Sequence, residues 1–401
     1  MKRLISLVLA LTMVLTFAAC KKDPTQNGGK DDEKMKVGLI CLHDENSTYD
    51  KNFIDAFKVA CAEADVEAVI VTNKAESGEC KEAALDLVDQ GCTLIFADSF
   101  GHEPYMLEAA KECPDVHFCH ATGTNAHTAN QPNFHNAFAA IYEGRYLAGI
   151  AAGMKLNEMI EAGKFKASEA KMGYVGAYTY AEVISGYTSF YLGAKSVCPT
   201  VTMEVKFTGS WYNETLEKEV AQALIGRGCK LISQHADSMG APTACEDAGV
   251  PNVSYNGSTL TACPNTFIVS SRIDWAPYYL YCINALKNGE KIDTDWTGTL
   301  ETGSVVLTEI NEKVAAKGTV EKIDAVKADL KAGKIHVFAT DAFTVKGKKL
   351  TSYMADIDSD PNYTPDTEVI KDGYFQESVY RSAPAFDLQI DGITFVGDPK
   401  F

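Results

Sequence analysis

The stretch that decides the fold is KVGLICLHDENSTYDKNFIDAFKVACAEADVEAVIV, residues 36–71. It opens with a nearly continuous apolar run, Lys36–Leu42, which is typical of a strand buried on both faces. Apolar side chains then recur at helical spacing over Asp50–Ala64, and Val66–Val71 forms a second short apolar run. A strand, an amphipathic helix and another strand in this order predict a parallel sheet covered by helices.

The same alternation continues along the chain and then restarts. Further strands are expected at Leu94–Ala97 and Val116–Cys119, with helices at Cys80–Gln90 and Tyr105–Lys111. The second series comprises strands at Gly173–Gly176, Val201–Phe207, Lys230–Ser233 and Asn252–Tyr255, with helices over 180–196, around 216–224 and over 242–248. A helix at Glu143–Glu158 lies between the two series, and another at Trp275–Asn288 follows the second. We therefore predict an α/β protein with two Rossmann-like lobes.

The length of 401 residues suits two domains with an accessory segment. We assign residues 35–141 with 272–297 to an N-terminal lobe, residues 142–271 with 298–340 to a C-terminal lobe, and residues 341–401 to a C-terminal extension. In the extension, Phe343–Leu350 alternates around a Lys-Gly turn, which predicts a β-hairpin. Phe386–Ile393 offers another extended piece. We expect the extension to be a strap packed on one lobe.

The N-terminus has the pattern of an exported lipoprotein. Lys2 and Arg3 precede an apolar run, Leu4–Phe17, and two alanines then lead to Cys20. This predicts a signal peptide over residues 1–19 and acylation of the Cys20 thiol, because the apolar run is shorter than a membrane-spanning helix. Residues 20–34 are polar and predict a flexible linker. We expect a lipid anchor on the extracytoplasmic face of the cell membrane; the alternative is a secreted protein with a chance cysteine.

Composition narrows the class of partner. The formal net charge of −17 argues against nucleic acid, which is bound mainly through Lys and Arg contacts to phosphate. Of the twelve cysteines, one is Cys20 and none forms a C-x-x-C pair. Several of the others lie in or beside apolar stretches, where a free cysteine behaves as a small buried hydrophobe. We expect mostly reduced thiols and a monomer.

Motifs of enzymes and metal sites are weak. The chain has no G-x-S-x-G, H-E-x-x-H, P-loop or strand-linked G-x-G-x-x-G motif. Three groups contain suitable residue types: His43-Asp44-Glu45, His117 with Cys119 and His120, and His235 with Asp237 and Ser238. Each is nearly contiguous, whereas metal ligands and catalytic triads usually converge from spaced positions. We predict no enzymatic activity, no metal and no cofactor.

The loops that follow the strands are where a ligand is expected. Ligands of open parallel sheets bind outside the carboxyl ends of the strands, and two facing sheets make a cleft that closes by hinge motion. These loops combine aromatic or amide groups with other polar groups, and several add a carboxylate. They are residues 42–49, 98–101, 177–182, 209–212, 234–238 and 255–257. Such a composition fits a flat ligand with several hydrogen-bonding groups, a nucleobase or nucleoside better than a sugar or an amino acid.

A family resemblance becomes specific at several motifs. They are YEGRYLAG at residues 142–149, GYVG at 173–176, Ser210-Trp211, QHADS at 234–238 and DWAPYY at 274–279. Together they resemble the basic membrane protein (Bmp/PnrA-like) substrate-binding lipoproteins, and the last three are most similar to the branch that binds purine bases. The resemblance implies a type I periplasmic-binding-protein fold. It also implies capture of a purine nucleoside or base for an ABC importer, with a permease and an ATPase as partners.

The resemblance also implies which residues bind the ligand. Tyr49 and Phe100 are expected to stack on it, with Tyr178 as the counterpart from the other lobe. Polar contacts are expected from Asp44, Ser99, Glu182, Trp211, Asp237 and Asn256. The first loop, residues 43–50, departs from the usual family pattern, so the stacking partner and the ligand stay open. The alternatives are a sensory receptor of the same fold, a binder of another polar ligand such as a sugar, and a secreted nucleoside hydrolase.

Overall fold

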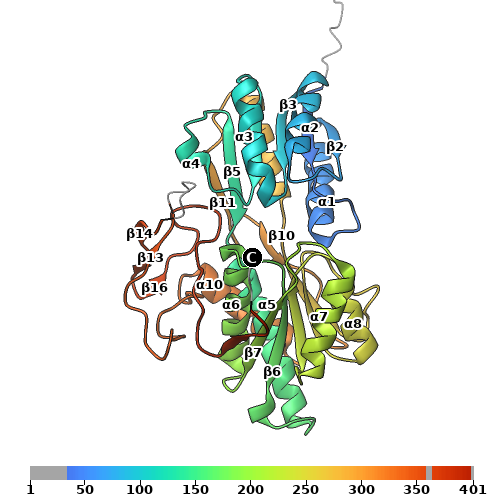
Figure 1. The fold of residues 1–401 in the computed structure, drawn as a ribbon, viewed down its shortest axis with the longest axis vertical. Helices are drawn as coiled ribbons and strands as arrows, with labels where there is room; N and C mark the ends of the chain where they lie inside the picture. Colours follow the sequence, from blue (N-terminus) through green and yellow to red (C-terminus); the bar gives the residue numbers. More distant parts are fainter. Residues whose placement is uncertain (1–33, 358–363, 399–401) are drawn as a thin grey trace, which may run out of the picture. The chain divides into compact units, whose positions relative to one another are not determined.

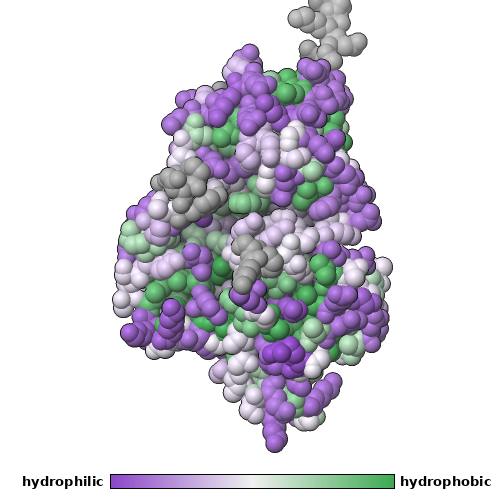
Figure 2. All heavy atoms as spheres, in the orientation of Figure 1, coloured by the Kyte–Doolittle hydropathy of each residue, from purple (hydrophilic) through white to green (hydrophobic). Residues whose placement is uncertain are grey.

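The structure, a computed structural model, describes residues 34–357 and 364–398 (Figure 1). The predicted signal peptide and Cys20, the predicted acylation site, lie outside these ranges. Among the described residues, none of the helices has the length and apolar composition needed to cross a bilayer. On the face shown in Figure 2, hydrophilic side chains predominate, in keeping with the net charge of −17.

The first lobe is built on a six-stranded sheet in the order β11-β5-β4-β3-β1-β2, and every pair in it is parallel. Its strands are β1 (Lys36–Ile40), β2 (Glu67–Val71), β3 (Cys92–Ala97), β4 (His117–Ala121), β5 (Phe134–Ala139) and β11 (Asp295–Gly298). Helices α1 (Thr48–Glu63) and α9 (Ala276–Asn288) pack together on one face of the sheet, and α2 (Gly78–Asp89) and α3 (Glu103–Glu112) pack together on the other. The short helices η1 (Phe100–His102) and α4 (Ala126–Ala129) follow β3 and β4.

The second lobe is built on a seven-stranded sheet in the order β12-β10-β9-β8-β6-β7-β17. Its strands are β6 (Lys171–Gly176), β7 (Thr202–Phe207), β8 (Leu231–His235), β9 (Asn252–Tyr255), β10 (Phe267–Ile273), β12 (Val305–Leu307) and β17 (Ile393–Phe395). Only β12 runs antiparallel to its neighbour in this sheet. Helices α5 (Ile141–Glu161) and α6 (Ala181–Val197) pack together, as do α7 (Glu214–Gly226) and α8 (Gly240–Ala248), and α10 (Thr319–Lys331) packs on α5.

The helix pair α5–α6 approaches unusually closely. A Cβ atom added to Gly149 would collide with the carbonyl oxygen of Phe190, and one added to Gly193 would collide with that of Tyr146. Glycine is therefore required at both positions, because only its missing side chain lets the two backbones meet. This contact fixes α5 against the second sheet.

The chain crosses between the two sheets three times. It passes from β5 into α5, from β10 into α9, and from β11 into β12. These crossings lie next to one another in the sheets, since β5 pairs with β11 and β10 pairs with β12. Three adjacent strand connections are the arrangement in which a hinge can flex without disturbing either core.

The predicted fold class is confirmed, with two largely parallel sheets and the strand–helix alternation where the sequence placed it. The sequence did not predict β5, β10, β11, β12 and α10. In β5 the pattern is broken by His135 and Asn136, which are buried because their side chains bond to Asp293 O (2.9 Å) and Glu103 (3.0 Å). The eleven described cysteines are free thiols, and ten of them are buried.

The C-terminal extension is less regular than predicted. The hairpin expected at Phe343–Leu350 is reduced to one antiparallel bridge between Val345 and Lys348. Short antiparallel pairs form elsewhere: β13 (Met354–Ala355) with β14 (Thr367–Glu368), and β15 (Ile370–Lys371) with β16 (Tyr374–Phe375). The extension ends in β17, which adds a parallel edge strand beside β7. The extension therefore packs on the second lobe through β17 and also contacts β11 of the first lobe, where Ser382 N donates to Asp295 Oδ2, so it is not confined to one lobe as expected.

We expect Ile393→Ala to lower the free energy of unfolding by roughly 2–5 kcal/mol, because Ile393 is buried where β17 joins the second sheet. Thr394→Ala, at the exposed neighbouring position of the same strand, is the matched control and should change stability little. Urea unfolding of both variants measures the difference. Equal stabilities would show that β17 is not part of the cooperative core.

Candidate ligand cavity

A cavity lies between the two lobes, with about 370 Å³ of space free of protein atoms, part of it open to solvent. It is lined by Leu42, His43, Tyr49, Asp50, Ser99, Phe100 and Thr122 of the first lobe and by Glu182, Trp211, His235, Asp237 and Tyr255 of the second. Both lobes therefore contribute side chains to one site.

The parallel topology explains why these residues meet. Leu42 follows β1, Ser99 follows β3, Thr122 follows β4, Trp211 follows β7, Asp237 follows β8 and Tyr255 ends β9, so the carboxyl ends of six strands face the cavity. Tyr49 and Asp50 arrive on the first turn of α1, which begins there because the Ser47 side chain accepts a hydrogen bond from Asp50 N (3.2 Å).

Six of the nine predicted ligand-binding residues line the cavity: Tyr49, Ser99, Phe100, Glu182, Trp211 and Asp237. The other three lie elsewhere. Asp44 Oδ1 accepts hydrogen bonds from the backbone and side-chain nitrogens of Asn46 (3.0 and 2.8 Å), so Asp44 closes a turn. Tyr178 packs behind Trp211, with ring centroids 5.0 Å apart, and Asn256 lines a different cavity.

Contacts across the cleft hold the lobes together. The backbone nitrogen and the hydroxyl of Thr48 both donate to Asp237 O, each at 3.0 Å. The ring of Phe100 lies 5.4 Å from that of Tyr180, and the ring of His43 lies 5.3 Å from that of Tyr212. Aromatic rings from both lobes thus frame the site.

Arg145 fixes the wall of the second lobe. This residue of α5 is 1% exposed, and its guanidinium donates to Gln234 O and to His235 Nδ1, both at 2.9 Å. It also lies 3.3 Å from the centre of the Tyr255 ring. Because arginine only donates, His235 Nδ1 must accept, and the imidazole proton sits on Nε2.

The Nε2 proton of His235 points to the carboxylate of Glu182, 3.3 Å from Oε1. Burial, and then the nearby charge of Arg145, lower the pKa of His235 to about 4. His235 is therefore neutral at physiological pH and acts as a fixed donor that orients Glu182 toward the cavity. The sequence had left Arg145 and His235 out of the predicted site, although both lie in motifs of the family resemblance.

Asp237 is the second acidic side chain that the second lobe contributes to the cavity. Burial, followed by the charges of Glu217, Asp50 and Glu182, raises the pKa of Asp237 well above its usual value. A neutral carboxyl donates a hydrogen bond as well as accepting one. The cavity therefore offers both donors and acceptors to a ligand.

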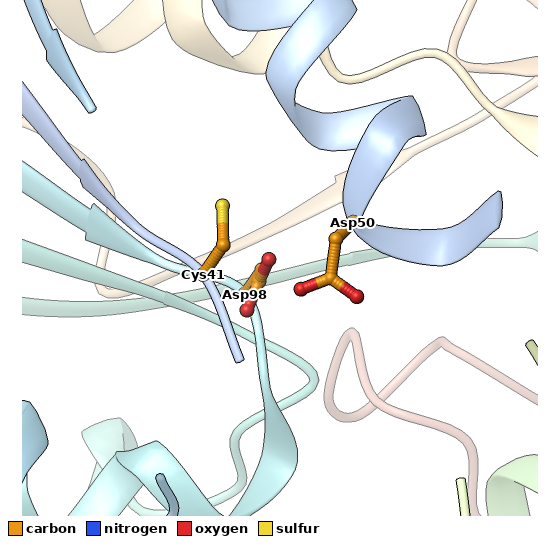
Figure 3. Close-up of side chains that lie close together, drawn as sticks. All are labelled: Cys41, Asp50 and Asp98. Carbon is orange, nitrogen blue, oxygen red and sulfur yellow. The ribbon is translucent and has the colours of Figure 1, made fainter. Parts of the chain in front are cut away.

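Beneath the cavity, Cys41, Asp50 and Asp98 converge, with ligand-type atoms within 4.8 Å of one another (Figure 3). Asp50 Oδ1 accepts from His43 N (2.7 Å), and Asp98 Oδ1 accepts from Leu42 N (3.1 Å). Oδ2 of both carboxyls is buried without a hydrogen-bond partner among the described residues.

The protonation of this cluster follows from its surroundings. Burial, and then the charge of Asp50, raise the pKa of Asp98 well above its usual value. Burial also acts on Asp50, but hydrogen bonds from His43 and Ser47 outweigh it and lower the pKa of Asp50. Burial raises the pKa of the Cys41 thiol. A neutral Asp98 beside an ionised Asp50 is the ordinary state of two close carboxyls.

The residue groups that first suggested metal or triad chemistry have other partners. His117 Nδ1 lies 3.0 Å from His135 Nε2, whereas His120 Nε2 lies 2.6 Å from Ser99 O. Glu45 pairs with Lys58 at 2.6 Å. His235 donates a hydrogen bond to Glu182, as described above.

Asp98→Asn should stabilise the protein at alkaline pH. The folded state keeps the Asp98 proton to a higher pH than the unfolded chain, so stability from this group is greatest below the ordinary carboxyl pKa of about 3.9 and is lost as pH rises through the raised pKa. Asparagine has the same shape and cannot ionise. We expect a higher Tm than wild type at pH 8 and a smaller difference at pH 5, with exposed Asp86→Asn as control. A lower Tm at pH 8 would contradict a neutral Asp98.

The chain resembles several known proteins in sequence. The model of the Bmp family, ABC transporter substrate-binding protein PnrA-like, matches residues 42–340. A purine-binding protein of Brucella abortus is 30% identical over 77% of this chain and 84% of its own length. A putative ABC transporter glucose-binding protein of Haloferax volcanii is 32% identical over 62% of this chain and 60% of its own length.

A solved structure of a solute-binding protein shares the fold. An ABC transporter solute-binding protein of Conexibacter woesei superposes with a TM-score of 0.61, at 20% identity over 75% of this chain and 98% of that one. The family match covers three quarters of the sequence. The two facing sheets, with a cavity between the carboxyl ends of their strands, are consistent with it. The chain belongs to the Bmp family of PnrA-like ABC transporter substrate-binding proteins.

Proposed function

We propose that the protein captures a purine nucleoside or purine base in the interlobe cavity for delivery to an ABC permease and its ATPase. The observation that carries the proposal is the combination of aromatic rings and mixed hydrogen-bonding groups at one site between the lobes. A purine presents two flat faces and an edge of alternating donors and acceptors, and the cavity offers complements to both.

Aromatic contact accounts for the faces of the base. Tyr49 and Phe100 of the first lobe and Trp211 of the second line the cavity, and a stacked aromatic pair contributes roughly 0.5–1.5 kcal/mol beyond its buried area. Tyr49 is held in place because its hydroxyl donates to Asp98 O at 2.7 Å. Two such contacts, together with hydrogen bonds to the polar edge of the base, bring the affinity for a purine toward the micromolar range.

The polar groups account for the edge. Glu182, oriented by His235, accepts from ligand N–H or O–H groups, and the neutral Asp237 donates to a ring nitrogen or carbonyl oxygen. The Brucella relative, which matches over the larger share of both chains, is described as purine-binding. The glucose-binding description of the archaeal relative makes a sugar the second candidate, since rings and carboxylates also suit hydroxyl-rich ligands.

The proposal includes a membrane tether. The sequence pattern of residues 1–20 supports export, cleavage after residue 19 and acylation of Cys20, which would hold the protein beside its permease on the extracytoplasmic face. A sensory receptor with the same fold remains the alternative in the absence of a permease. Mass spectrometry of the N-terminal peptide from membranes tests the acylation, and an unmodified Cys20 contradicts it.

A ligand screen by thermal unfolding tests the purine assignment. A ligand that binds only the folded state adds RT ln(1 + [L]/Kd), about 2.7 kcal/mol at a hundredfold excess over Kd. We expect a rise in Tm with adenosine, inosine, guanosine or their bases and none with glucose or amino acids. A shift with glucose alone would discard the purine and keep the binding-protein function.

Glu182→Gln should weaken binding by roughly tenfold or more, because a hydrogen bond to a charged group contributes about 1.5–3 kcal/mol. Glu219→Gln on the exposed side of α7 is the matched control and should leave affinity unchanged. Isothermal titration of both variants with the purine found in the screen measures the effect. Equal affinities would remove Glu182 from the site.

A further inference from the structure

A second hollow adjoins the ligand cavity at the mouth of the cleft. It encloses about 1290 Å³, part of it open to solvent, and shares Phe100, Thr122 and Glu182 with the ligand cavity. A ligand seated in the inner cavity therefore faces this outer hollow across the three shared residues.

The outer wall of the hollow belongs to the C-terminal extension. Tyr353, Arg381 and Asp387 line it, together with Met354, Asp356, Pro365 and Ala383 to Ala385. The family match ends at residue 340, so this wall lies outside the matched residues. Figure 1 shows the extension, in orange and red, running beside α6.

Hydrogen bonds hold this wall in place. Glu377, 3% exposed, accepts from the Ser185 hydroxyl of α6 (2.6 Å) and from the backbone nitrogens of Ala385 and Phe386 (3.0 and 2.9 Å). Ser382 N donates to Asp295 Oδ2 of β11 at 2.7 Å. The extension is thus bonded to elements of both lobes on either side of the cleft.

The groups on this wall are those that bind hydroxyls. The Tyr353 hydroxyl donates to Asp387 Oδ1 at 2.5 Å. Two nitrogens of Arg381 donate hydrogen bonds to Ala383 O (3.2 Å) and Pro384 O (2.9 Å). Its Nη1 has no hydrogen-bond partner among the described residues. Carboxylates accept from vicinal hydroxyls, and a guanidinium donates to their oxygens.

The junction between the two hollows has an unsatisfied hydroxyl. Thr122 is 3% exposed, and its Oγ1 has no hydrogen-bond partner among the described residues. Its backbone φ of 69° is an uncommon conformation for a β-branched residue, of the kind that is retained at ligand sites. A buried hydroxyl without a partner at this point suits a polar group of a ligand that passes from one hollow into the other.

The charges of the outer hollow select among polar groups. Glu182, Asp356 and Asp387 carry three carboxyls against the one guanidinium of Arg381. A phosphate would meet net repulsion there, whereas a neutral sugar would find acceptors and donors on both sides. The composition therefore favours a nucleoside over a nucleotide.

We infer that the C-terminal extension forms a second subsite that takes the sugar of a purine nucleoside while the base occupies the inner cavity. This inference rests on the proposed function and makes the extension a determinant of specificity. A free base would leave the subsite empty, and a nucleotide would bring its phosphate among the carboxyls.

Isothermal titration of the mature chain with a base, its nucleoside and its 5′-monophosphate tests the subsite, for example hypoxanthine, inosine and inosine monophosphate. We expect the nucleoside to bind at least tenfold more tightly than the base and the nucleotide to bind more weakly than the nucleoside. Equal affinity for base and nucleoside would overturn the subsite and leave the purine assignment standing. Absence of binding by every purine would overturn the proposed function and this inference with it.

Asp387→Asn isolates the contribution of the extension. We expect it to weaken nucleoside binding roughly fivefold to tenfold and to leave base affinity unchanged. Asp372→Asn, at an exposed turn of the same extension, is the matched control. Should Asp387→Asn fail to fold, as judged by circular dichroism, Tyr353→Phe probes the same wall. Equal losses for base and nucleoside, or no loss for either, would contradict the inference.

Discussion

The buried guanidinium of Arg145 is the interaction on which the ligand cavity depends. It reaches from α5 to His235 at the end of β8 and to the ring of Tyr255 at the end of β9. By forcing His235 Nδ1 to accept, it sets the tautomer that orients Glu182. The close packing of α5 on α6 through Gly149 and Gly193 holds the helix where this reach is possible.

The two walls of the cavity combine the same two kinds of acidic group. Each pairs an acid whose pKa burial raises, Asp98 or Asp237, with a carboxylate that hydrogen bonds hold in place, Asp50 or Glu182. Little net charge is therefore buried, while the cavity keeps both donors and acceptors. This combination of groups suits the neutral, planar ligand of the proposed function. The extension then adds charged and hydroxyl groups at the mouth, where solvent still reaches.

The sequence pattern placed most strands and helices because each β-α unit buries a continuous apolar strand and one apolar stripe of a helix. It failed where burial is achieved by other means. In β5 the polar His135 and Asn136 are buried through hydrogen bonds, so the apolar signal is lost. The site showed the same division: loops after strands gave six cavity residues, whereas Asp44 closes a turn and Tyr178 packs behind Trp211.

The sequence by itself determined the two-lobe α/β architecture and the family, because periodicity and local motifs are properties of contiguous residues. Only the tertiary structure decided which polar groups face one another across the cleft. Arg145 and His235 are 90 positions apart in the chain, and Thr122 and Asp387, which line the same outer hollow, lie in distant parts of it. The tautomer of His235, the shifted pKa values of the buried acids and the wall formed by the extension all depend on such distant pairs, and no local pattern encodes them.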